Sequence, residues 1–227
     1  MIVRRARPRR DLGSVSVDQE SEREPEHSPR QIGRGTALSI LVGMAGFAIV
    51  LDLVTKEWAT KLDPHEPIRL LGGAVYMSLT RNSGAAFSLL EDHTYIFPII
   101  AVVVLGALGF MARRLRSLPW AIALGMIFGG VFGNLVDRIF RAPAPFHGHV
   151  VDFISVFDAH GRAFPIFNVA DMALVGGVSL AILLELQGRQ RDGSRITSEK
   201  NTDTDDEPAP GDAPSAAVGS ERGSQAW

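Results

Sequence analysis

Four aspartates lie close to the ends of long apolar segments, and they are the residues of this chain best suited to chemistry. They are Asp52, Asp137, Asp152 and Asp171. Ionisable groups within or beside a bilayer are costly and usually functional. Two carboxyl groups held close together cannot both ionise readily, so one keeps a proton while the other can act as a base. Such a pair can activate water and polarise a carbonyl, as in aspartic proteases.

Two of these carboxyl groups have cations beside them in the sequence. Lys56 follows Asp52 by one helical turn and lies on the same face, and Arg138 directly follows Asp137. We therefore expect Asp52 and Asp137 to be held ionised and to support the structure, with Lys56 and Arg138 as their partners.

The other two aspartates, Asp152 and Asp171, have apolar neighbours and no nearby cation in the sequence. Desolvation by apolar surroundings favours the protonated form of a carboxyl group, which suits a proton-sharing pair. We predict that Asp152 and Asp171 form the catalytic pair. A helix cap or an ion pair is the structural alternative for each, and Asp137 with Asp171 is the alternative pair.

Other catalytic chemistries find little support. The absence of cysteine excludes disulfides, thiolate metal sites and cysteine nucleophiles, and no Gly-x-Ser-x-Gly motif is present. His147, His149 and Asp152 are metal-ligand types, but two histidines in a Pro/Gly-flanked loop are more often solvated. We expect no metal and no cofactor.

Four apolar segments must position the aspartates. They cover about residues 36–53, 95–112, 118–136 and 166–186. Each approaches the length of a bilayer-spanning helix, about 17–25 residues. They predict an all-α membrane protein, a bundle of four transmembrane helices. Residues 67–90 contain short apolar stretches broken by glycine-containing turns, which predicts a small β-sheet outside the membrane.

The two ends of the chain differ from its middle. Residues 1–35 and 188–227 are polar and charged and contain few large apolar residues, so we expect disordered tails around a membrane domain at 36–187. The formal net charge of -2 argues against a nucleic-acid partner.

Arginine density predicts the orientation. Arg113, Arg114 and Arg116 lie in the short link between the second and third segments, whereas the two longer loops mix charges of both signs. Cytoplasmic loops are enriched in Lys and Arg, so this link and both tails should be cytoplasmic. All four aspartates then lie at the outer interface.

Small and amide residues accompany the aspartates at this level. Asn134 lies three residues before Asp137, and Asn168 lies three residues before Asp171, so each pair shares a helical face. Gly125, Gly129 and Gly133 recur every four residues, which allows a neighbouring helix to approach closely. Gly133 could in addition give a substrate backbone room.

Five motifs, in order, resemble those of the bacterial lipoprotein signal peptidases (signal peptidase II). They are Asp52-Leu-Val-Thr-Lys56, Asn82-Ser-Gly-Ala-Ala-Phe87, Gly133-Asn-Leu-Val-Asp-Arg138, Val150-Val-Asp-Phe153 and Phe167-Asn-Val-Ala-Asp171. The resemblance covers about residues 36–187 and leaves both tails outside it.

The resemblance implies an aspartic endopeptidase of the bacterial plasma membrane. It would act on diacylglyceryl-modified prolipoproteins, cleave just before the lipidated cysteine and be inhibited by globomycin; we expect a monomer. The family's catalytic pair maps onto Asp152 and Asp171. Its supporting positions map onto Asp52, Lys56, Asn82, Gly84, Asn134, Asp137, Arg138, Asn168 and Ala170. The family also implies a small extracytoplasmic sheet and a mobile element over the site.

Two other functions stay open on the residues alone. Intramembrane aspartates often relay protons in transporters, but the polar groups here lie at one level, and none marks the inner halves of the segments until Glu185. A membrane adaptor could use the tails, yet it would leave the clustered aspartates without a purpose.

Overall fold

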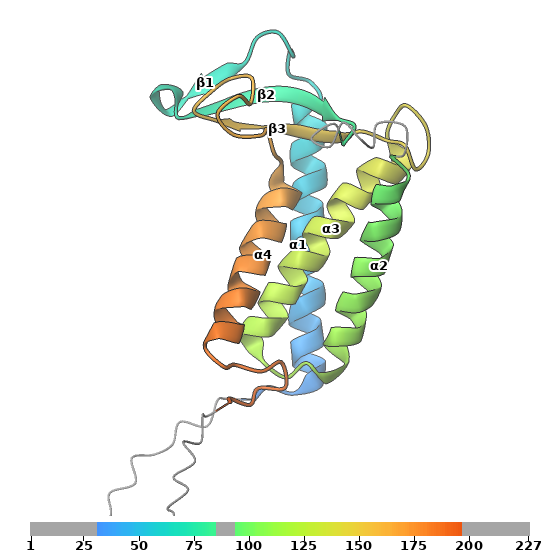
Figure 1. Ribbon diagram of the computed structural model, residues 1–227, viewed down its shortest axis with the longest axis vertical. Helices are drawn as coiled ribbons and strands as arrows, with labels where there is room; N and C mark the ends of the chain where they lie inside the picture. The colour runs from blue at the N-terminus through green and yellow to red at the C-terminus, as the bar shows by residue number, and fades with distance from the viewer. Residues whose placement is uncertain (1–30, 85–93, 197–227) are drawn as a thin grey trace, which may run out of the picture. The chain divides into compact units, whose positions relative to one another are not determined.

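The computed structural model describes residues 31–84 and 94–196. It contains four long helices (Figure 1): α1 (Arg34–Ala59), α2 (Ile96–Met111), α3 (Leu118–Phe140) and α4 (Val169–Leu186). A short 3-10 turn, η3 (Ala112–Arg114), extends α2, and all four helices are long and apolar enough to cross a membrane. The predicted four-span bundle is confirmed.

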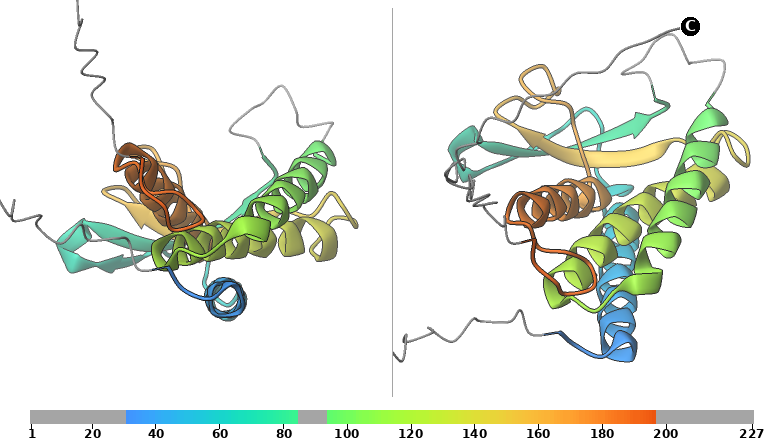
Figure 2. Two further views of the ribbon diagram at one scale, coloured as in Figure 1. Left: turned by 90° about the horizontal axis from the view of Figure 1, so that it is seen from below. Right: turned by 60° about the horizontal axis from the view of Figure 1, so that its bottom comes forward.

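Helix α3 lies at the centre of the bundle and contacts each of the other three helices (Figure 2). Its glycines make this possible. A Cβ added at Gly125 would lie 2.7 Å from the Leu41 carbonyl oxygen, and one at Gly129 would lie 2.9 Å from the Ala45 carbonyl oxygen. The glycine stripe predicted from the sequence therefore packs directly against the backbone of α1.

The outward faces of the helices are apolar. Phe47, Val103 and Val175 are each more than 60% exposed, and in α2 only Pro98 and Leu108 are buried. Exposing so many apolar side chains to water would be unfavourable. They suit a helix surface that is covered by lipid tails.

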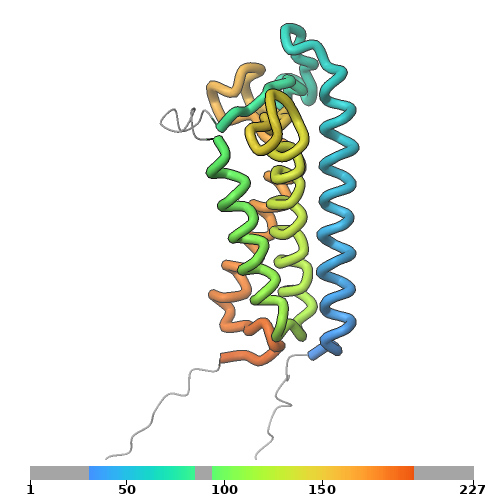
Figure 3. Tube along the Cα trace, turned by 90° about the vertical axis from the view of Figure 1, so that its right-hand side faces the viewer, coloured from blue at the N-terminus to red at the C-terminus, as the bar shows by residue number. Residues whose placement is uncertain are grey.

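A three-stranded antiparallel sheet covers one end of the bundle (Figures 1 and 3). Its strands are β1 (Ile68–Leu70), β2 (Val75–Asn82) and β3 (Val150–Val156), in the order β1-β2-β3, with the 3-10 turn η1 (Leu71–Gly73) between the first two. The predicted sheet at residues 67–90 is confirmed as two strands. The third strand comes from the second long loop, where the sequence had not predicted one.

Strand β3 was missed for a physical reason. Val150 to Phe153 are all buried, so the strand shows no alternation of polar and apolar residues. Val151 and Phe153 pack with Ala59 and Leu79, which attaches the sheet to the end of α1. Opposite Asp152, strand β2 presents Thr80.

Both ends of the described chain lie at the opposite end of the bundle from the sheet (Figure 3). Residues 188–196 form a turn there, closed by the hydrogen bond from the Ile196 amide to the Gly188 carbonyl. The rest of the two tails lies outside the described residues, and so do residues 85–93, which include the end of the second motif. The domain boundaries stay predictions.

Candidate active site

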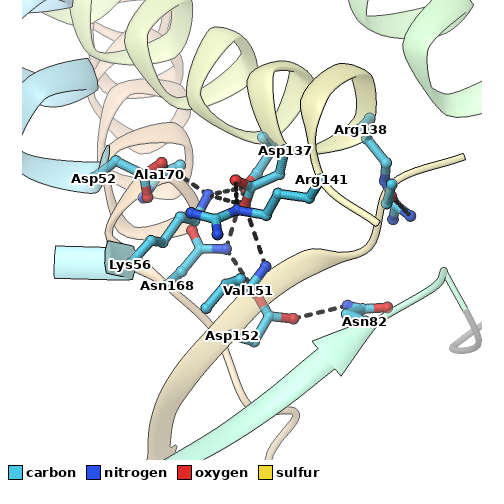
Figure 4. Close-up of polar contacts among 12 residues, drawn as sticks. Asp52, Lys56, Asn82, Asp137, Arg138, Arg141, Val151, Asp152, Asn168 and Ala170 are labelled. Atoms are coloured by element: carbon cyan, nitrogen blue, oxygen red, sulfur yellow. Dashed lines mark hydrogen bonds and ion pairs between the residues drawn. The ribbon is translucent and has the colours of Figure 1, made fainter. Parts of the chain in front are cut away.

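Lys56 is fully buried in the last turns of α1 and connects three acceptors. Its ammonium nitrogen lies 2.8 Å from Asp52 Oδ2, 2.9 Å from Asp137 Oδ2 and 3.0 Å from Asn134 Oδ1 (Figure 4). The ammonium group thus forms ion pairs with two carboxylates and donates a hydrogen bond to Asn134. Lys56 pairs with Asp52 as predicted, and it also joins α1 to α3.

Asp137 is neutralised by Lys56 and by Arg141. The Arg141 Nε donates to Asp137 Oδ1, and the backbone amide of Val151 donates to Asp137 Oδ2 over 3.2 Å. Asp137 therefore ties α3 to the strand that carries Asp152.

Arg138 does not form the ion pair with Asp137 that the sequence suggested. Adjacent residues point to different sides of a helix, whereas residues four apart share a face, so Arg141 takes this place. Arg138 instead donates to the Gly148 carbonyl over 3.2 Å, and its guanidinium lies 4.9 Å from the Phe97 ring centroid. It thus connects the end of α3 with the start of α2.

Asp152 is almost completely buried in β3, with 2% of its surface exposed. Its Oδ2 accepts from the Asn82 amide over 2.9 Å, and its Oδ1 accepts from the Asn168 amide over 2.7 Å (Figure 4). Burial raises the pKa of Asp152 to about 6; the negative charge of Asp171 adds to this rise, and the two amide donors oppose it.

Asp171 lies in the first turn of α4 and is held by the helix cap. Asn168 is the N-cap: its Oδ1 accepts from the Asp171 amide over 2.9 Å, and Asp171 Oδ2 accepts from the Asn168 amide over 3.1 Å. Asp171 Oδ1 also accepts from the Asn134 side chain over 2.8 Å. Asn168 therefore contacts both predicted catalytic carboxylates, one through its side chain and the other through its backbone.

Asp52 and Gly133 hold the start of α4 in place. Asp52 Oδ1 accepts from the backbone amide of Ala170 over 2.9 Å. A Cβ added at Gly133 would lie 2.7 Å from Asp52 Oδ2 and 3.2 Å from the Ala170 Cβ. The absence of a side chain at Gly133 thus makes room for this contact.

Gly84 serves a similar purpose on the other side of the site. Its φ of +100° lies in the left-handed region, and its amide donates to Asn82 Oδ1 over 2.8 Å. A Cβ at this position would collide with the Phe97 ring. Gly84 therefore fixes Asn82 in the orientation in which it reaches Asp152.

Both predicted catalytic aspartates line a cleft of about 420 Å³ between α2, α3, α4 and the sheet. The polar part of its lining consists of Asn82, Asn134, Arg138, Asp152 and Asp171. Most of the remaining lining is apolar and comes from the helices: Phe97, Ile100, Ala101, Val104, Val131, Leu135 and Leu174, with Val150 from β3. The cleft can thus hold an apolar segment against two carboxyl groups.

Comparisons with known proteins agree with this geometry. A family model described as signal peptidase (SPase) II matches residues 44–187. The lipoprotein signal peptidase of Mycobacterium avium is 45% identical over 169 residues, which is 73% of this chain and 90% of that protein. That of Streptomyces coelicolor is 46% identical over 158 residues, 69% of this chain and 75% of that protein. The chain belongs to the signal peptidase II family.

A solved structure supports the same fold. It is described as a bacterial membrane enzyme determined by the in meso method at 1.9 Å resolution, and it is 32% identical with a TM-score of 0.58. The likeness covers 71% of this chain and 99% of that one. As a member of the signal peptidase II family, the chain is an aspartic peptidase of a membrane.

All twelve site residues predicted from the sequence lie at the sheet end of this signal peptidase II fold. Sequence reasoning missed Arg141, although its spacing of four from Asp137 was a usable signal. It also missed the contributions of the Val151 amide and the Phe97 ring, which no spacing rule reveals. Within residues 31–84 and 94–196, no group of three His, Cys, Asp or Glu residues is placed to hold a metal ion.

Proposed function

We propose that this chain removes signal peptides from diacylglyceryl-modified prolipoproteins and cleaves just before the lipidated cysteine, with Asp152 and Asp171 as the catalytic pair. The observation that carries the proposal is the cleft in which these two carboxyl groups, linked through Asn168, face an apolar lining. Such a cleft suits a substrate that arrives from the bilayer as a hydrophobic segment.

The raised pKa of Asp152 favours this residue as the one that holds the shared proton. Asp171 suits the role of base, because it lies at the positive N-terminal end of α4 and accepts two hydrogen bonds. Asp152 would donate to the carbonyl oxygen of the scissile bond while Asp171 takes a proton from water.

The reaction then proceeds in two steps. The water oxygen attacks the carbonyl carbon, its proton passes to Asp171, and the proton of Asp152 passes to the carbonyl oxygen. In the second step the C–N bond breaks, Asp171 gives its proton to the leaving nitrogen of the cysteine, and Asp152 recovers a proton from the tetrahedral intermediate. The products are a signal peptide with a free carboxylate and a lipoprotein with a free amine.

The supporting residues keep this pair in position. Asn82, Asn134 and Asn168 orient the two carboxyl groups by donating to their oxygens. Asp52 and Asp137, joined by Lys56, hold the two elements that carry these carboxyl groups: Asp137 binds the Val151 amide of β3, and Asp52 binds the Ala170 amide of α4. Preorganised donors of this kind avoid reorganisation during the reaction.

The orientation in the membrane follows from the arginines of the α2–α3 turn. These residues and both tails are cytoplasmic in our proposal, and the site faces the extracytoplasmic side of a bacterial plasma membrane. Water reaches the carboxyl groups there, while the lipid chains attached to the substrate cysteine stay in the bilayer. We also propose that the enzyme acts as a monomer, uses no cofactor and is inhibited by globomycin.

The test is to incubate the purified chain with a diacylglyceryl-modified prolipoprotein and with the same precursor lacking the lipid. We expect release of the signal peptide from the lipidated precursor alone, and globomycin should block it. A transporter or an adaptor would leave both precursors intact. Equal cleavage of both would contradict the proposed substrate requirement.

A further inference from the structure

A second pocket lies at the end of the bundle opposite the sheet. Its volume is about 450 Å³, and it is formed where α2 ends and the chain turns towards α3. Its lining consists of two apolar residues, Phe110 and Met111, and three arginines, Arg113, Arg114 and Arg191. None of these residues takes part in the proposed peptidase site.

Arg191 belongs to the segment after α4, and contacts of this segment with the α2–α3 turn and with α3 hold it at the pocket. The Trp120 indole N–H donates to the Arg189 carbonyl over 2.7 Å, and the Arg116 amide donates to the Arg191 carbonyl over 2.8 Å. The Arg191 guanidinium lies 5.8 Å from the centroid of the Trp120 ring, where a cation is attracted to the aromatic face. The pocket is therefore built from two separate parts of the chain rather than from one basic run.

The positive charge of this pocket is only partly balanced within the described residues. The ion pairs within residues 31–84 and 94–196 all join Asp52 or Asp137 to Lys56 or Arg141, and none includes an arginine of this pocket. Asp192, the acid next to the pocket, interacts electrostatically with Arg114, but it is exposed and accepts hydrogen bonds from the amide and hydroxyl of Ser194.

The apolar part of the lining places the arginines at the level of lipid headgroups. Phe110 is 69% exposed and, with Met111, ends the membrane-spanning helix α2. Acyl chains can pack against these two side chains while a headgroup reaches the guanidinium groups directly beyond them. Guanidinium groups bind phosphate oxygens through two parallel hydrogen bonds.

We propose that Arg113, Arg114 and Arg191 bind the phosphate of an anionic phospholipid in the leaflet at the α2–α3 turn. Basic pockets at the ends of transmembrane helices are suited to such headgroups. Free phosphate shares the charge but not the acyl chains that Phe110 and Met111 would contact. The acidic run at residues 203–207 of this chain is a competing anion, and the test includes it.

The test uses the full chain, stripped of lipid in detergent, and native mass spectrometry of its lipid adducts. Phosphatidylglycerol, phosphatidylcholine and inorganic phosphate are added separately. We expect preferential retention of phosphatidylglycerol and no competition from inorganic phosphate at equal concentration. Retention of both lipids to the same degree, or displacement by phosphate, would overturn the proposal of a lipid site.

Two double variants distinguish specific phospholipid binding in the pocket from nonspecific electrostatic attraction. Arg113→Gln with Arg114→Gln removes two charges from the pocket, and Arg34→Gln with Arg195→Gln removes two exposed charges outside its lining at the same end. The first should weaken phosphatidylglycerol binding by about 25-fold, since each arginine near the surface contributes roughly a fivefold factor. The second should change it little; equal losses would show diffuse electrostatics and no site.

The acidic run is tested in the same full chain by changing its four acids, Asp203, Asp205, Asp206 and Glu207, to the corresponding amides. Unchanged phosphatidylglycerol binding supports the lipid as the occupant of the pocket. Binding that occurs only after this change would show that the chain's own acids occupy the arginines, which overturns the proposal. Signal-peptide release in phosphatidylcholine should not differ among these variants, so the outcome is independent of the proposed peptidase function.

Discussion

The carboxylate of Asp137 accepts a hydrogen bond from the backbone amide of Val151, the residue directly before Asp152. Asp137 also contacts Lys56 and Arg141, so its oxygens are engaged on three sides. Because its two oxygens already contact two cations and an amide, Asp137 acts as a structural link between α1, α3 and β3. This arrangement favours Asp152 over Asp137 as the partner of Asp171, and it gives Asp137 the task of positioning β3.

The catalytic pair can be tested by removing its ability to hold a proton. We expect Asp152→Asn and Asp171→Asn each to abolish signal-peptide release while the helices stay folded and the precursor still binds. The double variant should be little worse than either single one, because residues that act as a unit are not additive. Asp63→Asn, at an exposed acid in the loop before β1, is the matched control and should retain activity.

The same experiment examines the alternative pair. Asp137→Asn should reduce the folded yield more than the turnover of the molecules that do fold. If Asp152→Asn kept near-normal turnover and Asp137→Asn gave a stable but inactive enzyme, the pair would be Asp137 with Asp171.

The pH dependence of stability follows from the raised pKa of Asp152. The folded chain holds this proton up to about pH 6, whereas the ordinary value is 3.8, so the folded state binds it more tightly than the unfolded state. The fold is favoured at low pH and loses this contribution as the pH rises through 6. Relative to Asp152→Asn, the wild-type free energy of unfolding should fall by about 2 kcal/mol between pH 4 and pH 7.

Unfolding in mixed detergent micelles at both pH values measures this difference. Asp63→Asn should show no comparable change, since Asp63 is exposed. A constant difference between wild type and Asp152→Asn would mean that the burial of Asp152 does not disfavour its charge.

The supporting cations should differ in importance. Lys56→Ala would leave the Asp52 and Asp137 carboxylates without the ammonium group that they share, and removal of one partner from a buried pair costs about 3–5 kcal/mol. Arg138→Ala should cost less, because Asp137 keeps Lys56 and Arg141. Thermal unfolding of the purified variants ranks them; a larger loss for Arg138→Ala would contradict the ion-pair assignment.

The absence of a side chain at Gly133 should contribute to stability, as the buried ion pairs do. Gly133→Ala would push a methyl group against Asp52 and Ala170, and overpacking of this kind typically costs about 1–3 kcal/mol. Gly46→Ala is the control, since a Cβ there meets nothing within 4 Å. An alanine in an open helical position is neutral or stabilising by up to about 1 kcal/mol. If both variants showed the same melting temperature and activity, Gly133 would not make room for the Asp52 contact.

The sequence predicted the parts of the site that depend on helical periodicity. Asp52 with Lys56 and Asn168 with Asp171 are separated by four and three residues, and the structure joins both pairs. It could not predict that Asn168 reaches Asp152, because that contact depends on how β3 approaches α4. The predicted partner of Asp137, Arg138, is wrong for another reason. The prediction rests on adjacency in the sequence, whereas helical spacing places Arg141 on the same face as Asp137.

The sequence predicts the outer ends of the first and third spans too early, for a related reason. The first segment was expected to end at residue 53, yet α1 continues to Ala59 and carries Lys56 inside it. A hydropathy pattern ends at the first charged residues, but these charges neutralise each other within the bundle and do not interrupt the helix. Tertiary pairing thus extends a helix beyond the point where its composition suggests an end.

The proposed orientation can be tested directly because the chain contains no cysteine. Glu66 and Asp192 are exposed at opposite ends of the bundle, in the loop before β1 and in the turn after α4, so Glu66→Cys and Asp192→Cys each give one reporter. A membrane-impermeant maleimide should label position 66 in intact spheroplasts and position 192 only after permeabilisation. The expectation follows from the arginines beside position 192, since such residues are enriched on the cytoplasmic side of membrane proteins. Labelling of position 192 alone in intact spheroplasts would place the aspartates on the cytoplasmic side, where a signal peptide that has already crossed the membrane could not present its cleavage site to them.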